Sequence, residues 1–410
     1  MKAMMLTKHK LGDLLEVTRG ASLSGEYFST QGDYMRLTCG NFDYQNNCFK
    51  SNTSKDNLYY TGNFNQEYLM KKDDIITPLT EQAVGLLGST AWVPESGKYI
   101  QSQDVAKITP NEKLLDKKFC YYLISSKVVK QQLSAAAQQT KIRHTSPDKI
   151  KDCTVWIPSL EEQTKIGQFL YDIDSKIALN RQINDNLEAM ARQLYDYWFV
   201  QFDFPDEKGK PYKSNGGKMV WNEELMRNIP SSWNVQPIGD ILDRYTTTKK
   251  YTTKEYLSYG NYPIIDQGDS YIVGFTNESD NLLTRHPAVL FGDHSTKVKY
   301  LDFDFARGAD GTQILYSNNE CVSEHYLYFY VKSINIPNPG YSRHFKYLKS
   351  FPIIVPAKVT IARFERIVNS LFKKWTQNIF QDIELSKQRD ELLPLLMNGQ
   401  ATVNYHLSDD

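Results

Sequence analysis

The sequence lacks the long apolar runs, paired cysteines and net charge that mark several broad classes of protein. No apolar run in the 410 residues approaches the roughly 18 residues of a membrane span, and residues 1–13 lack a signal-peptide core. The five cysteines form no Cys-x-x-Cys pair, so we expect reduced thiols in a cytoplasmic protein, without a zinc site or disulfide framework. The formal net charge is zero, so nucleic-acid binding would need local basic patches or a charged partner.

Common catalytic motifs are also missing. The sequence has no GxxxxGK[ST], HExxH or GxSxG motif, which disfavours the nucleotide, metalloprotease and hydrolase sites that these motifs build. Asn338-Pro339-Gly340-Tyr341 resembles the Asn-Pro-Pro-Tyr of amino-methyltransferases, but it lacks the second proline and no glycine-rich cofactor loop precedes it. We interpret it as a turn. Asp293-His294-Ser295 are neighbours on one loop and cannot form a catalytic triad, whose members converge from different segments. We therefore predict no catalytic residue and no metal ligand in this chain.

What the chain does have is a long helical repeat between Leu160 and Phe202. Two interleaved series recur every seven residues, which is typical of the apolar seam of a coiled coil. Ser159 is expected to cap this helix. At about 1.5 Å per residue it would be roughly 60 Å long, and it needs a partner helix to bury its seam. The predicted seam residues of the first helix are Ile166, Leu170, Ile173, Ile177, Asn180, Leu187, Leu194 and Trp198.

The chain supplies that partner by duplication. A shift of 198 residues places Phe364 on Ile166 and Asn378 on Asn180, and the heptad phase agrees along the whole second helix. Seam asparagines lower stability but help to set register and orientation. We expect the two helices to pair antiparallel, with the second ending near Leu393 because Pro394 disfavours a helix interior. Its predicted seam residues are Phe364, Val368, Leu371, Trp375, Asn378, Leu385 and Leu392.

Each long helix follows a strand-rich globule with frequent Gly, Asn and Asp turn signals. In the first globule we expect strands around 74–77, 90–93, 105–108 and 153–157, and a helix at 119–132. In the second, residues 288–291 repeat the buried strand of 74–77, and Arg343-His344 precedes the last strand much as Arg143-His144 does in the first. The linker should be docked through Met219, Val220, Trp221, Ile229 and Trp233. The predicted fold class is α+β, with an internal pseudo-two-fold duplication and these bounds: 1–158 first globule, 159–202 first long helix, 203–235 linker, 236–356 second globule, 357–398 second long helix and 399–410 tail.

With these features in place, the chain resembles the specificity subunit of Type I restriction-modification enzymes. The resemblance covers almost the whole length and is carried by short motifs. One departure is that the second helix opens Pro356-Ala357-Lys358-Val359, without the Glu-Glu-Gln of the first. The matching segments are Trp156-Ile157-Pro158-Ser159-Leu160-Glu161-Glu162-Gln163, Tyr197-Trp198-Phe199, Phe202-Asp203-Phe204, Gly217-Lys218-Met219-Val220-Trp221, Ile229-Pro230-Ser231-Ser232-Trp233 and Leu392-Leu393-Pro394-Leu395-Leu396-Met397-Asn398-Gly399.

The resemblance implies a non-catalytic subunit with two target-recognition domains, each of which reads one half of a bipartite double-stranded DNA sequence. The helices would set the spacing between the half-sites, and a rod of about 60 Å would correspond to roughly 18 base pairs at about 3.4 Å each. The implied partners are two methyltransferase (modification) subunits and restriction/translocase subunits. The chain itself would bind no cofactor; the methyltransferase would use S-adenosylmethionine, and the restriction subunit ATP and Mg.

Candidate DNA contacts are polar and basic residues on loops between strands, because base edges are read by side chains and phosphates position the protein. The Arg-His pairs stand out because both halves place them before the same strand. The alternative interpretation of each residue is a solvated surface group, and that of the Arg-His pairs is a structural turn. The candidates are Arg19, Ser22, Arg36, Thr80, Gln82, Lys141, Arg143 and His144 in the first globule, and Lys249, Lys250, His294, Ser295, Lys297, Arg307, Arg343 and His344 in the second.

Three other functions stay open at this point. A coiled-coil scaffold that joins two copies of a partner protein would need the same architecture, but it would have no affinity for duplex DNA. A free-standing nuclease or methyltransferase would bind S-adenosylmethionine. The partner of a specificity subunit could also be a single fused restriction-modification polypeptide. The residues do not specify the DNA target sequence or the oligomeric state of the isolated chain.

Overall fold

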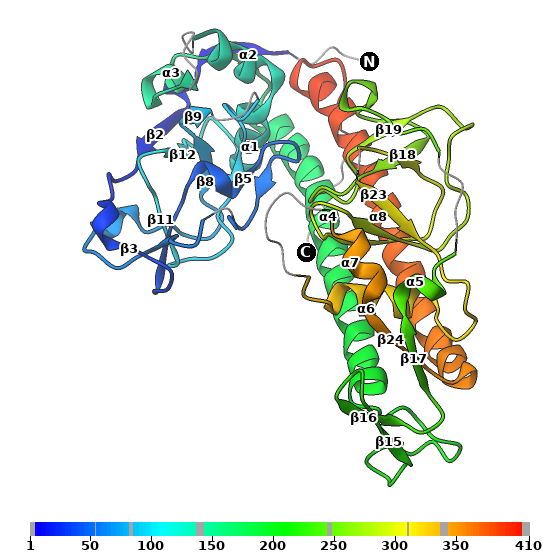
Figure 1. The fold of residues 1–410 in the computed structure, drawn as a ribbon. Helices are drawn as coiled ribbons and strands as arrows, with labels where there is room; N and C mark the ends of the chain where they lie inside the picture. Colours follow the sequence, from blue (N-terminus) through cyan, green and yellow to red (C-terminus); the bar gives the residue numbers. More distant parts are fainter. Residues whose placement is uncertain are drawn as a thin grey trace. The chain divides into compact units, whose positions relative to one another are not determined.

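The computed structural model describes residues 5–53, 55–81, 85–136, 143–243, 248–309, 311–336 and 343–403 (Figure 1). Gln82, Lys141 and the Asn338–Tyr341 turn therefore lie outside the described residues, as does the side chain of Arg143. The chain divides into two compact units, of which the first is built from two separate parts of the sequence and the second from one continuous part. Unit 1 comprises residues 1–177 and 384–410, and unit 2 comprises residues 178–383.

Unit 1 is a mixed domain whose central sheet has the strand order β10-β8-β12-β2, with antiparallel neighbours throughout. A second sheet, β11-β4-β7-β3, contains one parallel pair, β11 with β4. Strands β1 and β14 pair next to the start of the first long helix. The strands are β1 (Thr7–Lys10), β2 (Leu15–Arg19), β3 (Phe28–Ser29), β4 (Tyr34–Arg36), β5 (Phe42–Asp43), β6 (Cys48–Phe49), β7 (Tyr59–Tyr60), β8 (Ile75–Pro78), β9 (Thr80–Glu81), β10 (Ala91–Trp92), β11 (Tyr99–Ile100), β12 (Val105–Pro110), β13 (Arg143–His144) and β14 (Thr154–Ile157).

The predicted helix at 119–132 is wrong in one respect, because the structure has two helices there. Ser126 leaves helical geometry at ψ 153°, which ends α1, and its backbone C=O accepts the first hydrogen bond of α2, from Lys130 N at 3.0 Å. The break turns the buried face of α1 (Phe119 to Ser125) independently of α2, which buries only Val129 and Leu133. The helices of unit 1 are η1 (Leu11–Asp13), η2 (Gly25–Tyr27), η3 (Cys39–Asn41), η4 (Gln66–Tyr68), α1 (Lys117–Ser125), α2 (Lys127–Ala136) and α3 (Pro147–Lys151).

Unit 2 repeats this plan with fewer strands. The sheet β21-β20-β23 is antiparallel and its central strand, β20, is completely buried. The sheet β19-β18-β22 again contains one parallel pair. The elements are β15 (Met219–Asn222), β16 (Arg227–Pro230), β17 (Asn234–Pro237), α5 (Ile238–Ile241), η6 (Thr253–Glu255), β18 (Tyr262–Ile265), β19 (Gly274–Thr276), β20 (Ala288–Gly292), β21 (Val298–Leu301), β22 (Ala306–Arg307), β23 (Thr312–Leu315), α6 (Glu324–Ser333), α7 (Phe345–Ser350) and β24 (Pro352–Val355).

The duplication is visible in local packing as well as in element order. A Cβ placed on Gly12 would lie 3.1 Å from Cβ of Lys151, and one placed on Gly239 would lie 3.1 Å from the backbone O of Lys349. Both glycines thus sit where a short helix presses against the residues just before the last strand, β14 in unit 1 and β24 in unit 2. The predicted α+β class with internal duplication is confirmed.

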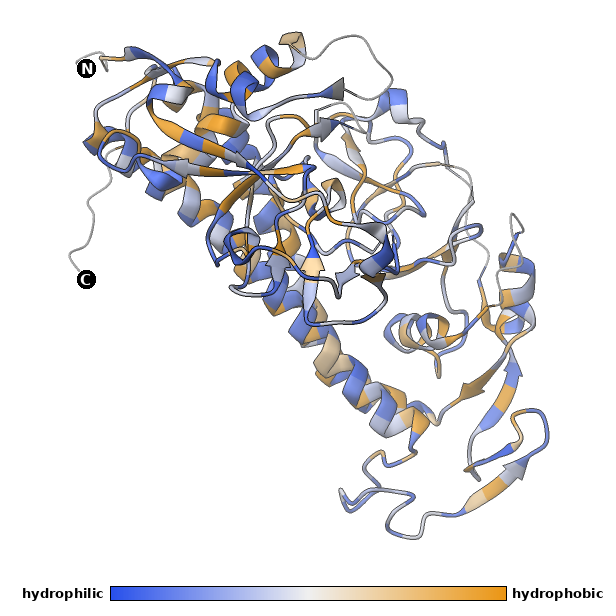
Figure 2. Cartoon of the chain, turned by 90° about the vertical axis from the view of Figure 1, so that its left-hand side faces the viewer, coloured by the Kyte–Doolittle hydropathy of each residue, from blue (hydrophilic) through white to orange (hydrophobic). Residues whose placement is uncertain are grey.

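The two long helices contribute to both units. α4 (Leu160–Tyr195) is followed by the π-helical turn η5 (Asp196–Val200), and α8 spans Lys358–Met397. Ser159 caps α4 as expected, because its Oγ accepts a hydrogen bond from Glu162 N at 3.4 Å. In Figure 2, hydrophilic and hydrophobic residues interleave along the long helices. No helix among the described residues has the length and hydropathy to cross a membrane.

The expected end of the second helix near Leu393 is wrong. α8 continues through Pro394 to Met397. Pro394 forfeits one backbone hydrogen bond near the end of the helix, and the final turn buries Leu396 and Met397 in the core of unit 1. Burial of two large apolar side chains contributes about 1.5–3 kcal/mol each, which offsets the lost bond.

Within unit 2 the helices pair antiparallel through polar seam residues. Asn180 Nδ2 donates to Asp382 Oδ1 at 2.7 Å, and Asn378 Nδ2 donates to Asn184 Oδ1 at 2.8 Å. Partner numbers fall along α8 as they rise along α4, which defines the antiparallel direction. Every residue of the predicted seam is buried or half-buried.

The linker packs against unit 2 through part of the expected anchor set. Ile229 and Trp233 are buried in the core, and Met219 packs against it. Val220 and Trp221 are exposed, so their prediction as anchors is wrong. The two residues are consecutive in β15 and point to opposite faces of the two-stranded β15–β16 hairpin, and neither face is covered at these positions.

Candidate nucleic-acid interface

In unit 1 the predicted polar loop and the first Arg-His pair meet at one place. The buried strand β8 leads through Leu79 into β9, which pairs with β13 so that Thr80 lies opposite His144 and Glu81 opposite Arg143. Thr80 Oγ1 lies 3.4 Å from His144 Nδ1. Thr80 is buried and His144 is exposed, so the pair joins the domain core to the surface.

In unit 2 the loop after the buried strand also contacts the segment with the Arg-His pair, but through different residues. The buried strand β20 leads into Asp293, whose backbone O accepts from His344 N at 2.8 Å. The Asp293 carboxylate accepts a second bond from Phe345 N at 2.8 Å. Both units therefore join the loop after the buried strand to the segment that carries the Arg-His pair.

The two histidines do different things. His144 presents its ring at the surface, whereas His344 has no exposed area and begins α7 through its backbone. His344 therefore holds the loop that begins at Asp293 through its backbone, and its side chain does not reach the surface. Arg343, its neighbour, is exposed.

The Asp293–Lys297 loop is supported from below by the loop 266–270. Gln267 accepts from His294 N through Oε1 at 3.0 Å and from Ser295 Oγ through its backbone O at 2.6 Å. Gly311 closes over this contact with φ +83°, and a Cβ there would lie 2.5 Å from Gln267 Nε2. Lys297 is exposed and its Nζ pairs with Asp269 Oδ1 at 2.9 Å.

Lys299 anchors the 266–270 loop from inside. Its Nζ donates to the backbone O of Asp266 at 2.7 Å and of Ser270 at 2.6 Å. Burial lowers the pKa of Lys299 to about 8. A buried ammonium group thus helps to order the loops beneath His294 and Ser295.

Three other residues that were predicted to contact DNA bind other parts of the protein through their side chains. Arg36 Nη2 donates to Asn57 O at 3.2 Å, its guanidinium lies 3.8 Å from the Phe28 ring centre, and burial lowers its pKa. Arg307 is 4% exposed and its Nη2 donates to Thr248 O at 2.9 Å. Lys249 Nζ pairs with Glu255 and Glu278, each at 3.1 Å. These side chains stabilise loops as placed.

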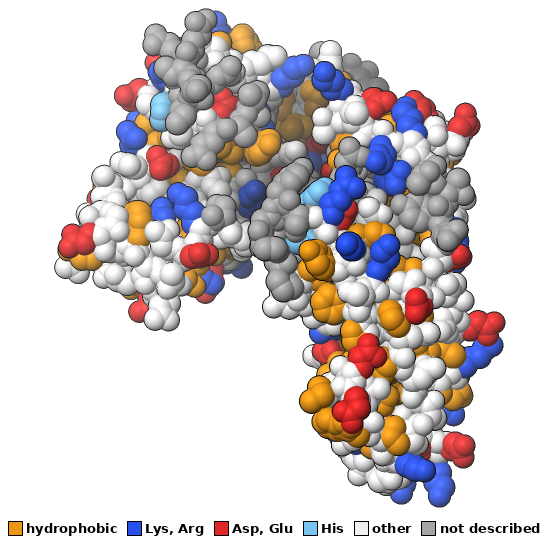
Figure 3. Space-filling model, viewed as in Figure 1, with side chains coloured by type: hydrophobic (Ala, Val, Ile, Leu, Met, Phe, Trp, Pro, Cys, Tyr) orange, Lys and Arg blue, Asp and Glu red, His pale blue; other side chains and the backbone are white. Residues whose placement is uncertain are grey.

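The remaining described candidates are exposed. Ser22 and Lys250 lie at the surface, and Arg19 Nε donates to Gln103 O at 2.8 Å from an exposed position. The predicted contacts did not include Lys346 and Lys349, which are exposed on α7 three residues apart. That spacing was the available signal, since residues three apart share a helix face. Figure 3 shows Lys, Arg and His side chains gathered around α7 and β23 in this view.

Comparison with known proteins agrees with this repeated plan. The family described as "Type I restriction modification DNA specificity domain" matches residues 6–189 and 230–384. The chain is 24% identical over 326 residues to the MjaIX specificity subunit of Methanocaldococcus jannaschii, which covers 74% of this chain and 73% of that protein. It is 23% identical over 388 residues to the HindI specificity subunit of Haemophilus influenzae, covering 74% and 81%.

Among solved structures, the Type I restriction-modification S subunit from M. genitalium shares the fold. The match covers 97% of both chains at 18% identity and a TM-score of 0.56. The family match covers well over half of the chain and falls on both halves of the duplication. The chain therefore belongs to the Type I restriction-modification DNA specificity family.

Proposed function

We propose that this chain is the DNA-specificity subunit of a Type I restriction-modification complex. Each unit supplies one target-recognition domain for half of a bipartite double-stranded DNA sequence. The observation that carries the proposal is that the two family matches fall on two halves that repeat the same strand–loop–Arg-His plan. One loop plan with different residues suits two readers of different half-sites.

The exposed basic side chains at α7 also support DNA binding. The chain has no net charge, yet Arg343 just before α7 and Lys346 and Lys349 within α7 are exposed, and His344 N joins the start of this segment to Asp293. Such side chains suit phosphate contacts that position a protein, whereas the polar loop suits base edges. The methyltransferase subunits would supply further phosphate contacts.

The chemistry belongs to the partners in this proposal. Two modification subunits transfer the methyl group from S-adenosylmethionine, and restriction/translocase subunits use ATP and Mg. This chain binds no cofactor and positions DNA. Saturable binding of S-adenosylmethionine by the purified chain would contradict that division of labour.

The decisive experiment is methylation sequencing of host DNA in cells with and without this gene. We expect a methylated bipartite motif that disappears when the gene is deleted. The motif then allows a gel-shift assay of the complex of this chain with its modification subunits. Duplexes would carry both half-sites, or one scrambled half-site with base composition conserved.

Scrambling either half-site should weaken binding strongly, because each mismatched base pair costs about 1–3 kcal/mol. Scrambling the spacer, with its length kept, is the matched control and should change little. Equal affinity for all duplexes, with no motif in the methylation data, would instead favour the coiled-coil scaffold.

A further inference from the structure

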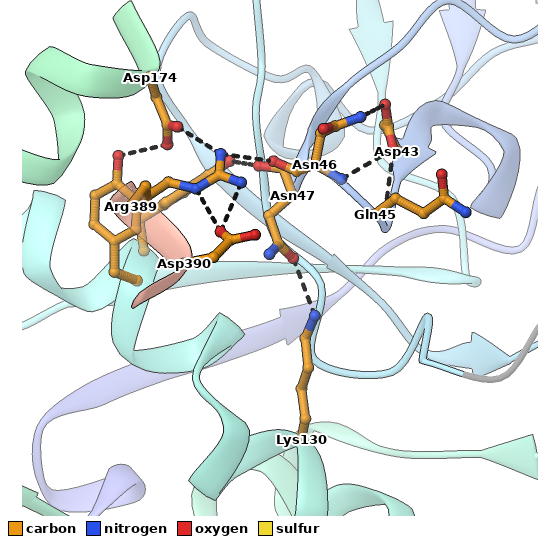
Figure 4. A network of polar contacts seen from close by, with 10 residues as sticks. Asp43, Gln45, Asn46, Asn47, Lys130, Asp174, Arg389 and Asp390 are labelled. Carbon is orange, nitrogen blue, oxygen red and sulfur yellow. Dashed lines mark hydrogen bonds and ion pairs between the residues drawn. The ribbon is translucent and has the colours of Figure 1, made fainter. Parts of the chain in front are cut away.

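A buried arginine links the long helices to a turn of the recognition domain in unit 1. Arg389 of α8 is 8% exposed at its side chain, and its Nη1 donates to Asp174 Oδ1 of α4 at 2.8 Å. Its Nε donates to Asp390 Oδ1 at 2.9 Å, and Tyr122 OH of α1 donates to Asp174 Oδ2 at 2.7 Å. Figure 4 shows Arg389 lying between the two carboxylates.

The same guanidinium reaches the turn between β5 and β6. Arg389 Nη1 lies 3.5 Å from Asn46 O, and Lys130 Nζ donates to Asn47 Oδ1 at 3.2 Å (Figure 4). Tyr121 OH also donates to Asn47 O. Asp43 stiffens the turn internally, because its carboxylate accepts from the backbone N and the side chain of Asn46 at 3.1 and 2.7 Å. The turn is thus held by α1, α2 and α8.

The β5–β6 turn and the residues just before it contact the segment predicted to carry the recognition loop. The Tyr44 ring lies 4.0 Å from the Cβ position of Gly85, and Gly85 N donates to Glu81 Oε1 at 2.7 Å. Just before β5, Cys39 Sγ donates to Thr80 O at 3.4 Å. Two contacts therefore connect the β5–β6 segment to β9, where Thr80 faces His144.

Unit 2 does not use an arginine at the corresponding helix position. The shift of 198 residues places Arg389 on Ala191, which is fully buried in an apolar and aromatic core. Helix pairing at this position therefore does not require a charge. Burial of the Arg389 guanidinium is costly in desolvation, and its ion pair with the half-buried Asp174 is weak support for stability, so its use in unit 1 points to a role in fixing geometry.

We propose that Arg389 is a positioning residue for target recognition: through the β5–β6 turn it holds β9 and Gly85 of unit 1 in a set orientation to the parts of α4 and α8 that belong to unit 1. This inference rests on the proposed function, since it concerns how DNA is read. It assigns a role in specificity to a side chain on the helical pair, which is not itself a base-reading residue.

The test uses the full chain in complex with its modification subunits and three variants. Arg389→Met removes the planar, forked guanidinium group and keeps an unbranched apolar side chain. Arg389→Met with Asp174→Asn also neutralises Asp174, the half-buried carboxylate that loses its arginine partner, so it remains informative if the single variant does not fold. Arg389→Lys keeps the charge without the planar fork and should rescue part of the effect. Ile150→Val, a core change in unit 1 outside the network, is the matched control.

The first readout is affinity for duplexes with both half-sites and a spacer shortened or lengthened by one base pair. The wild-type complex should discriminate against the altered spacers, and the Arg389→Met variants should lose about tenfold of that discrimination, or 1.4 kcal/mol. Ile150→Val should lower thermal stability and keep the wild-type discrimination. Wild-type discrimination in the folded Arg389 variants would overturn the inference.

The second readout does not depend on DNA. Hydrogen exchange should accelerate in residues 42–49 and 85–88 of the Arg389→Met variants and stay at the wild-type rate in Ile150→Val. Unchanged exchange there would also overturn the inference. If the wild-type complex itself shows no preference for a bipartite duplex, the proposed function fails, whereas normal wild-type binding with unaltered variants removes only the role of Arg389.

Discussion

Several basic side chains in this protein, two of them buried and one half-buried, hold loops in place. Arg36, Arg307 and Lys299 each donate to backbone carbonyls of neighbouring loops. A donor that is satisfied in this way is costly to remove, because the carbonyls it leaves behind are desolvated. Other predicted contacts reach outward, and they include His144 and Arg343.

The first prediction concerns these two outward residues. The double variant His144→Ala/Arg343→Ala should bind the cognate duplex at least about tenfold more weakly, since a single DNA contact contributes roughly 1–3 kcal/mol. Gel shift at fixed salt measures the affinity, and size-exclusion chromatography measures assembly with the modification subunits. Assembly should be unaffected because both side chains are exposed. Unchanged affinity would remove both residues from the interface.

A second prediction follows from the pKa of Lys299, which burial lowers to about 8 from 10.5. Between these values the unfolded chain binds more protons than the folded chain, so this group makes the free energy of unfolding rise with pH from 8 to 10.5. The full effect is about 3 kcal/mol. Below pH 8 the contribution is constant.

Urea denaturation at several pH values should show a smaller rise in Lys299→Met than in the wild type. Lys346→Met alters an exposed lysine elsewhere in unit 2 and should keep the wild-type slope. Equal slopes in wild type and Lys299→Met would refute the assignment.

At the scale of elements, the helices show how the heptad pattern and the local chemistry cooperate. The seven-residue repeat predicts where α4 and α8 bury residues, and Ser159 predicts where α4 begins. The repeat could not predict that α8 passes Pro394, because the compensating burial of Leu396 and Met397 involves residues nearly 400 positions earlier in the chain, such as Leu11.

The third prediction tests the polar seam of unit 2. Asn378→Leu leaves Asn184 Oδ1 without its donor, so the free energy of unfolding should fall by about 1–3 kcal/mol. Adding Asn184→Leu replaces both partners with apolar groups and should recover most of the loss. Denaturation of both single variants and the double variant gives the coupling free energy. Strictly additive losses would show that the two asparagines do not act as a pair.

Short strands are where local sequence information was weakest. Residues 74–77 and 105–108 lie within one residue or two of β8 and β12, because both strands are long and apolar. Two-residue strands such as β9 and β13 carry no recognisable alternation, although they join the recognition loop to the Arg-His pair. Their pairing depends on partners about 60 residues apart.

At the scale of the whole molecule, unit 1 is completed by the C-terminal part of the chain. Leu396, Met397 and Arg389 belong to unit 1, although residues 178–383 form the other unit. The first recognition domain is therefore not an independent N-terminal domain.

The fourth prediction is that truncation after residue 383 selectively destabilises unit 1. Loss of Leu396 and Met397 alone removes about 3–6 kcal/mol of apolar burial. Hydrogen exchange should show loss of protection in residues 5–177 and retained protection in the sheet β21-β20-β23 of unit 2. Truncation after Val403 is the control and should preserve both. Equal protection of unit 1 in the two truncated chains would contradict its dependence on α8.

The amino-acid sequence was sufficient to establish the duplication, the two long helices, the α+β class and the segments that carry the recognition loops. These depend on periodicity, on turn residues and on motifs that are local in the chain. Tertiary structure alone decided that His344 is buried while His144 is exposed, that Val220 and Trp221 face outward, and that Arg389 joins a helix to a distant turn. Burial and long-range hydrogen bonds depend on which surfaces meet, and neighbouring residues in the chain do not encode that choice.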